Sequence, residues 1–179
     1  MRKYLLFCSI IIIICFSNIF ICLNVVININ KDRNNKVLDI FNSVWDSSID
    51  VGFDGMDRLP KMEIDEVDYI GVIKIGDYEV LFPVESNCQI LSSVCRYSSK
   101  KFIILGNNLK SSFYNYELYG VGDVVIFINT LGEEFRYRIS KIDRVRKIEE
   151  ISNDKDDLVV VVKNYYSMEY MFFRCKREC

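Results

Sequence analysis

Apolar positions along the chain follow three patterns, one after another. Residues 4–27 contain no charged residue and consist largely of Ile, Leu, Phe, Val and Cys. At a rise of about 1.5 Å per residue, a helix of this length crosses a hydrocarbon core of ~30 Å. Arg2 and Lys3 precede the run, and no small-residue cleavage site follows it. We therefore expect residues 1–27 to form an uncleaved signal anchor, with a cleaved signal peptide as the alternative.

The second pattern, in residues 28–60, has helical spacing. An Asn-rich polar stretch at residues 28–35 predicts a short connector after the membrane segment. Apolar residues then recur at the spacing of an amphipathic helix: Val37, Ile40, Phe41, Val44 and Trp45. We expect this helix to pack on the following domain or to rest near the membrane surface. Residues 46–60 are rich in Asp, Ser and Gly and predict a loop.

From Tyr69 onward, apolar and polar residues alternate with a period of two, which is typical of β-strands. Residues 70–75 and 78–82 flank Gly76-Asp77 and predict a hairpin. Further strands are predicted at residues 102–105, 124–128, 135–142, 158–163 and 170–175, with turns at residues 120–123, 131–132 and 152–154. Short strands at this regular spacing predict a mainly β domain over residues 61–179, either a closed barrel or a sandwich.

Composition narrows the chemistry of that domain. The chain has no histidine, so it lacks an imidazole for general-base catalysis, proton transfer or metal binding. Arg2 and Lys3 are the only charged residues before Lys31, which leaves a net charge of -4 on the remainder against -2 for the whole chain. A weakly acidic domain without a basic stripe does not favour nucleic acid as a partner. We expect no cofactor and no metal.

The seven cysteines fall into two groups. Three lie in the apolar run, where they serve as small apolar residues: Cys8, Cys15 and Cys22. The other four belong to the later part of the chain: Cys88, Cys95, Cys175 and Cys179. None of them forms a CxxC pair, which argues against a zinc site. A disulfide among these four is compatible with an oxidising compartment, and the sequence leaves its pairing open.

Several segments resemble the sortases, the cysteine transpeptidases of Gram-positive cell surfaces, and are most similar to class B and clostridial forms. The segments are YIGVIKI (residues 69–75) with PV (83–84), CRYS (95–98), FIILGNNLKSSF (102–113), YGVGDVVIF (119–127), DLVVVVK (157–163) and RCKR (174–177). They follow one another in the family order without large gaps. The resemblance implies a closed β-barrel of about eight strands with short helices, preceded by a transmembrane helix.

The resemblance breaks at the three catalytic positions. The sortase histidine follows a glycine that corresponds to Gly106, but Asn107 stands there; Lys163 replaces the cysteine, and Tyr170 replaces the arginine. In the family, the thiolate attacks a carbonyl, the histidine protonates the leaving amine, and the arginine stabilises the oxyanion. A protonated lysine is a poor nucleophile, asparagine transfers no proton, and tyrosine carries no fixed positive charge. The resemblance therefore implies an inactive homologue.

The function that this resemblance suggests is binding or scaffolding. We expect a single-pass protein of the cell membrane whose C-terminal domain is extracytoplasmic and holds a peptide, a pilin, a cell-wall component or an active sortase. The candidate binding residues are Asn107, Lys163, Tyr170 and Tyr165. Other tyrosines are expected on loops beside the groove or in the packing of the barrel rim: Tyr114, Tyr116, Tyr119 and Tyr166.

Three alternatives stay open at the level of sequence. In the first, the chain is a paralogue without a specific ligand. In the second, Lys163 and Asn107 condense into an isopeptide, with Glu169 or Asp157 as the assisting carboxyl group. In the third, a desolvated Lys163 acts as a nucleophile with Tyr170 as the acid, which gives a cysteine-independent transpeptidase. The isopeptide would make the chain a self-crosslinked structural protein.

Overall fold

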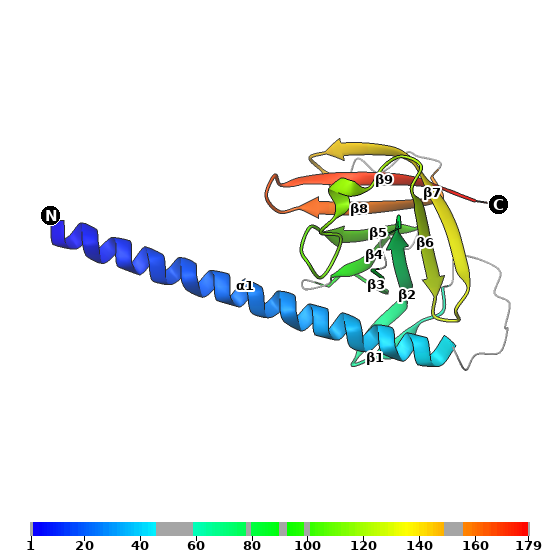
Figure 1. Ribbon diagram of the computed structural model, residues 1–179, viewed down its shortest axis with the longest axis horizontal. Helices are drawn as coiled ribbons and strands as arrows, with labels where there is room; N and C mark the ends of the chain where they lie inside the picture. The colour runs from blue at the N-terminus through cyan, green and yellow to red at the C-terminus, as the bar shows by residue number, and fades with distance from the viewer. Residues whose placement is uncertain are drawn as a thin grey trace.

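A long helix leads into a β-barrel in the computed structural model, which describes residues 2–45, 59–77, 80–89, 93–98, 101–148 and 156–178 (Figure 1). The helix is α1 (Arg2–Trp45). The strands are β1 (Met62–Ile64), β2 (Val67–Ile75), β3 (Phe82–Glu85), β4 (Val94–Ser98), β5 (Ile103–Asn107), β6 (Val124–Asn129), β7 (Glu134–Val145), β8 (Leu158–Asn164) and β9 (Glu169–Arg177), with a 3-10 turn, η2 (Tyr116–Leu118), before β6. The expected turn at residues 152–154 and most of the expected loop at residues 46–60 lie outside the described residues.

The strands close into a barrel. They follow the order β2-β3-β4-β5-β8-β9-β7-β6, and β6 pairs back with β2, while β1 adds to the outer edge of β2. The β3–β4 and β5–β8 pairs are parallel, and the other ladders are antiparallel. The expected closed barrel of about eight strands is confirmed, and the sandwich alternative is wrong.

The two faces of β8 explain its unbroken apolar run. Val160 and Val162 point into the barrel and join the main core with Ile104 and Phe173. Residues of the opposite parity form a second buried cluster on the outer face: Ile103, Val159, Val161 and Phe172. A strand buried on both faces needs apolar residues at successive positions, so the alternation of the other strands is lost here.

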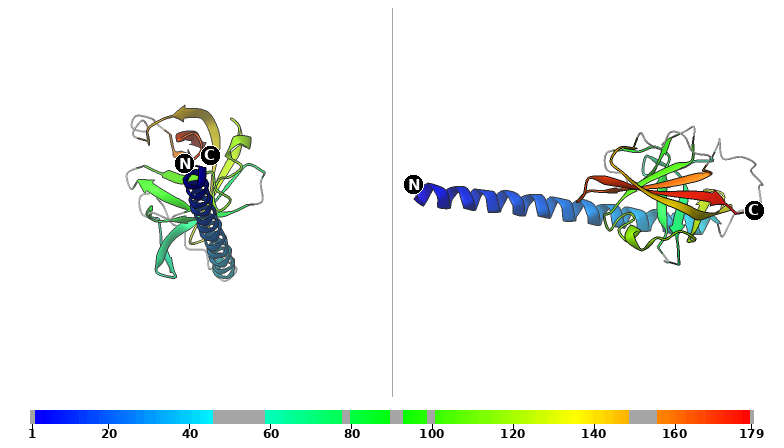
Figure 2. Two further views of the ribbon diagram at one scale, coloured as in Figure 1. Left: turned by 90° about the vertical axis from the view of Figure 1, so that its left-hand side faces the viewer. Right: turned by 90° about the horizontal axis from the view of Figure 1, so that it is seen from above.

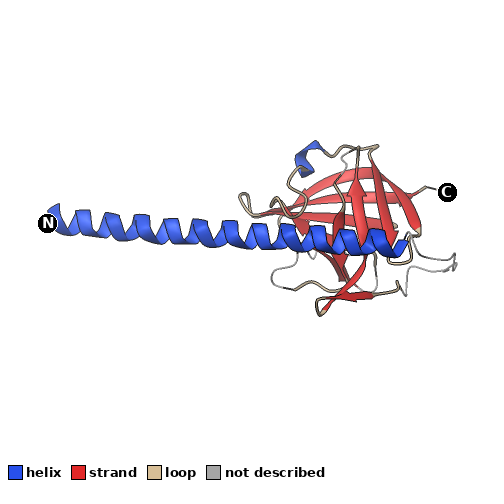
Figure 3. Ribbon diagram, turned by 60° about the horizontal axis from the view of Figure 1, so that its bottom comes forward, coloured by secondary structure: helices blue, strands red, loops and turns tan. Residues whose placement is uncertain are grey.

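One continuous helix replaces the connector expected at residues 28–35. No glycine or proline interrupts α1 after the apolar segment, and each asparagine costs a helix less than about 0.7 kcal/mol. Burial of Val37 and Phe41 against Ile64, Tyr69 and Val72 outweighs that cost. The amphipathic stripe therefore packs on the barrel, and the helix reaches it without a break (Figure 3).

Polar contacts fix α1 to the barrel as well. Arg33 Nη2 lies 2.7 Å from Glu85 Oε1, and this carboxylate is buried. One residue later, Asn34 Nδ2 donates to the Ser111 carbonyl at 3.0 Å. Lys36 Nζ lies 2.6 Å from Asp65 Oδ2 at the surface. The helix is thus attached at β3, at the β1–β2 turn and at the connection that follows β5.

The expected hairpin around Gly76-Asp77 is formed with a longer connection. Ile73 of β2 pairs with Phe82, so β3 begins at Phe82 rather than at residue 78. Residues 78 and 79 lie outside the described chain. The sequence pattern did not indicate β1, which is only three residues long. The turn between β1 and β2 is formed by Asp65 and Glu66, both at positive φ, where Gly or Asn is usual. Nor did the pattern indicate β4, whose polar residues obscure the alternation.

Candidate functional site

Asn107, Lys163 and Tyr170 lie in one row across three neighbouring strands. Asn107 on β5 pairs with Lys163 on β8, and Lys163 pairs with Tyr170 on β9. Adjacent strands are about 4.8 Å apart, so the three Cα atoms span roughly 10 Å. These three residues, called the site row below, share the parity of the outer cluster, so their side chains lie on the outer face of the barrel.

The site row lines a pocket of about 240 Å³. The pocket is lined by Cys88, Gln89, Cys95, Tyr97, Leu105, Gly106, Asn107, Ile148, Lys163, Tyr165 and Tyr170. All four sequence-predicted binding residues are among them. The sequence did not indicate the wall formed by β4, by the two residues Cys88 and Gln89 that precede it, and by Ile148, three residues beyond β7, because this wall depends on strand pairing rather than on any motif.

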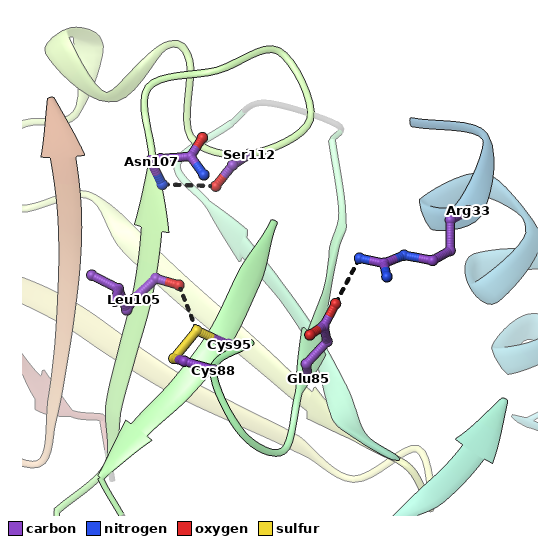
Figure 4. Close-up of a disulfide and its surroundings, with 7 residues drawn as sticks. All are labelled: Arg33, Glu85, Cys88, Cys95, Leu105, Asn107 and Ser112. Atoms are coloured by element: carbon purple, nitrogen blue, oxygen red, sulfur yellow. Dashed lines mark hydrogen bonds and ion pairs between the residues drawn. A yellow bond between two sulfur atoms is a disulfide. The ribbon is translucent and has the colours of Figure 1, made fainter. Parts of the chain in front are cut away.

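A disulfide forms part of this wall (Figure 4). Cys88 and Cys95 are bonded, with their Cα atoms 5.0 Å apart. Cys95 pairs with Leu105 on β5, and its Sγ atom lies 3.7 Å from the Leu105 carbonyl oxygen. The pairing that the sequence left open is thereby resolved for these two cysteines, and the sulfur atoms that line the pocket are oxidised.

The backbone around Asn107 is tightly packed. A Cβ atom at Gly106 would lie 2.4 Å from the Phe113 ring, so this position requires glycine. Asn107 N–H donates to Ser112 Oγ at 3.0 Å, and its side-chain Oδ1 accepts the Leu109 N–H at 3.0 Å. The Asn107 amide therefore caps the turn that follows β5, and its side chain is held in place beside the pocket.

Lys163 is the one charged residue among the described residues that line the pocket. Its Nζ lies 5.0 Å from the centre of the Tyr165 ring, a cation–π contact worth about 0.5–1 kcal/mol at an exposed site. Tyr170 is partly buried and packs against the outer cluster. Among the hydrogen bonds of the described residues, none joins Lys163 to Asn107. The arrangement offers a cation, an aromatic wall and a fixed amide.

The thiol and the guanidinium nearest along β9 lie away from the pocket. Cys175 faces the main core, and burial raises its pKa to about 12. Arg174 donates to Asp143 at 2.6 Å and to Asp156 at 3.1 Å. Arg174 pairs with Val159 on β8, four residues before Lys163, or about 13 Å along the strand. Neither side chain lines the pocket.

The carboxyl groups considered for an isopeptide lie away from the pocket. Glu169 pairs with Asn164 in the ladder and lies 3.7 Å from Arg144. Asp157 accepts the Arg177 N–H at 2.9 Å, near the opposite end of β8. Carboxylate side chains do not line the pocket within the described part of the chain. Among the described residues, the geometry therefore places no assisting acid at the pocket.

The tyrosines expected beside the groove have different roles. Tyr116 and Tyr119 are buried in the main core, so their packing role is confirmed. Tyr116 OH also accepts the Asn164 Nδ2–H at 2.6 Å, which ties η2 to the β8–β9 turn. Tyr165 lines the pocket, whereas Tyr166 is 87% exposed.

Comparisons with solved structures reveal the fold. Sortase A from Corynebacterium diphtheriae superimposes with a TM-score of 0.55 at 16% identity, over 64% of this chain and 62% of that one. A Clostridium perfringens sortase D5 transpeptidase gives a TM-score of 0.53 at 16% identity, over 63% and 80% of the two chains. The chain has the sortase fold. A C. perfringens sortase C solved with the C-terminal cell wall sorting motif gives 0.54 at 17% identity, over 86% and 88%.

Sequence comparisons add no further relatives. No family model matches the chain, and no curated protein matches it significantly. The match to the C. diphtheriae structure covers less than two thirds of that chain. The assignment of the sortase fold therefore rests on the structural similarity of the barrel. The resemblance to class B forms stays a prediction, because the three structures above are described as sortases A, D5 and C.

Proposed function

We propose that this sortase-fold chain is a membrane-anchored, extracytoplasmic binding module without transpeptidase activity. The observation that carries the proposal is the site row, where Asn107, Lys163 and Tyr170 occupy one pocket at the positions that the sequence resemblance gives to histidine, cysteine and arginine. A pocket at these positions that is lined by a cation, an amide and aromatic rings, without the reactive groups, suits retention of a ligand. It serves cell-surface or cell-wall assembly in this proposal.

The chemistry of the pocket supports inactivity. Sortase-type transfer needs a thiolate nucleophile and a proton donor for the leaving amine. The sulfur atoms at this pocket belong to a disulfide, and the buried Cys175 thiol, with its raised pKa, faces the core. Loss of the reacting groups in such enzymes lowers the rate by several powers of ten.

The ligand that fits this pocket best is a peptide that directs a carbonyl or carboxylate oxygen at Lys163. The C. perfringens sortase C structure contains a cell wall sorting motif, which makes such a peptide the first to test. Lys163 would supply a charged donor and Tyr165 an aromatic wall. A pilin, a wall component or an active sortase would bind the pocket through a peptide segment of the same kind.

The anchor completes the proposal. α1 contains one stretch that is long and apolar enough to cross a membrane. We assign residues 1–27 to the anchor, residues 28–60 to the segment that joins it to the barrel, and residues 61–179 to the sortase-fold domain. The disulfide supports an extracytoplasmic location for that domain, because disulfides persist in oxidising compartments.

The test uses the full chain in detergent with a fluorescent sorting-motif peptide and an acceptor amine. We expect the peptide to bind and to be recovered intact. Lys163→Ala should weaken binding about tenfold, since a hydrogen bond to a charged group contributes about 1.5 kcal/mol or more. Lys74→Ala on β2, remote from the pocket, is the matched control and should bind as the parent does. Peptide joined to the amine, or equal binding by both variants, would contradict the proposal.

A further inference from the structure

The β8–β9 turn, residues 165–168, presents apolar side chains that folding does not explain. Tyr166 is 87% exposed and Met168 is 66% exposed, the highest values among the large apolar side chains of the described barrel residues. Met168 also has a φ of 56°, where glycine or asparagine would be less strained. A bulky apolar residue at such a position adds backbone strain and exposed apolar surface at once.

This turn is held rigidly. Asn164 Oδ1 accepts the N–H of Tyr166 at 2.8 Å and that of Ser167 at 3.2 Å. Asn108 Oδ1 accepts the Tyr165 N–H at 3.2 Å, and Asn108 Nδ2 donates to Asn164 at 3.1 Å. The apolar side chains are therefore projected from a fixed platform rather than from a loose loop.

The β8–β9 turn lies on the side of the barrel from which α1 enters. β5 and β8 point toward the side on which the N-terminal half of α1 lies, and the turn that follows β8 projects on that side of the barrel in Figure 1 and in the view from above in Figure 2. Attachment through Arg33, Asn34 and Phe41 fixes the barrel on the helix. Arg33 follows the last residue of the apolar segment by six positions, or about 9 Å of helix.

We propose that the β8–β9 turn lies in the interface of the same bilayer that α1 crosses, with Tyr166 and Met168 among the lipid headgroups and upper acyl chains. The proposal rests on the membrane anchor proposed above. Tyrosine is favoured at this depth because its ring is apolar and its hydroxyl remains hydrated. Met168 supplies a flexible apolar contact.

The position of Tyr165 connects this surface with the pocket. Tyr165 belongs to the turn and also lines the pocket beside Lys163. With the turn in the interface, the mouth of the pocket opens next to the lipid headgroups. The barrel is then held at two points, by α1 and by the turn, which fixes the direction in which the pocket faces.

Fluorescence quenching tests the contact. Trp45 is the single tryptophan, so Trp45→Phe provides a silent background for Tyr166→Trp. Val121→Trp is the matched control, because Val121 is 65% exposed and lies near the opposite end of β8. Its neighbour Gly122 donates to the carbonyl of Ile139 on β7. The strand register places Ile139 level with Cys175 on β9 and with Leu158, the first residue of β8. Both full-length variants are reconstituted in phosphatidylcholine–phosphatidylglycerol vesicles that carry a spin label at the headgroup.

We expect the emission of the Tyr166→Trp variant to be shifted to the blue and largely lost to the headgroup quencher, while the emission of the Val121→Trp variant stays that of a hydrated indole. Equal quenching of the two variants in protein that resists carbonate extraction would overturn the interfacial contact and leave the anchor standing. Release of the chain by carbonate would overturn both the contact and the anchor. Peptide binding in detergent is measured separately, so failure of the pocket proposal is recognised independently.

Discussion

Lys163 stands in the middle of the site row, between an amide that is already engaged and a tyrosine that packs on the outer cluster. Its ammonium group contacts the Tyr165 ring, and the described lining of the pocket holds no carboxylate. A lysine in this setting attracts carbonyl or carboxylate oxygen atoms of a ligand. At the position that the resemblance gives to the nucleophile, a residue of this kind supports the proposal that the pocket holds a ligand rather than attacks it.

Substitution of this lysine tests the position that the resemblance assigns to it. In Lys163→Cys, the new thiol should face the pocket and react with a maleimide in the folded protein, since the outer face is open there. Cys175 should not react, because it is buried and its pKa is raised to about 12. Mass spectrometry of the labelled peptides identifies the modified residue. A Lys163→Cys protein that reacts only after denaturation would contradict the assignment.

The intact mass distinguishes a free lysine from an isopeptide. We expect the mass of the sequence with one disulfide, because no assisting carboxyl group lies at the described lining of the pocket. Lys163→Ala and Asn107→Ala serve as matched controls, and each should differ from the parent by its substitution alone. A parent mass lower by one further ammonia, with the deficit absent from both variants, would establish the crosslink.

Asp143 makes stability sensitive to acid. Hydrogen bonds from Arg174, and then from Lys141, lower the pKa of Asp143 below its ordinary value. The stabilisation is complete above the unfolded-state pKa of about 3.9 and is lost as the pH falls through the lower folded-state value. Thermal melts between pH 7 and pH 2 should show a smaller acid-induced fall in Tm for Asp143→Asn than for the parent. Parallel curves for the two proteins would contradict this assignment.

At the scale of elements, α1 differs most from the expectation. The polar residues after Ile27 predicted a connector, yet the helix continues because its far end packs on the barrel and Asn34 bonds to Ser111. Local propensity indicates where a helix is weak, whereas docking decides whether it breaks. Most strands were predicted where alternation was clear, but the strand expected at residues 78–82 begins only at Phe82, and β1 and β4 were missed because their formation depends on their partners.

The Arg33–Glu85 contact is the polar part of that docking. Glu85→Ala should destabilise the barrel–helix unit by about 3 kcal/mol, because it leaves a half-buried guanidinium without its anion. Glu63→Ala on β1, whose carboxylate is exposed, is a matched control and should have little effect. Urea unfolding followed by Trp45 fluorescence measures both, since Trp45 packs in the same cluster. Equal midpoints for the two variants would refute a structural role for the pair.

At the scale of the whole molecule, the site could be predicted only in part. Motif spacing assigned Asn107, Lys163 and Tyr170 to family positions, and the strand register brings them into one row. The disulfide wall, Tyr97 and Ile148 could not be predicted, because they reach the pocket through the parallel β3–β4 contact and the course of β7. Chain segments that are remote in sequence meet there, and no local pattern records such a meeting.

The closed ladder limits how the peptide proposed above would be recognised. β5, β8 and β9, which form the floor of the pocket, each pair with a strand on both sides, so their main-chain groups are already bonded. An extended peptide therefore cannot be read here by β-augmentation, in which a ligand becomes the next strand of a sheet. For the peptide proposed above, selectivity would therefore come from the side chains and turn amides around the pocket, and the ladder itself would take no part in it.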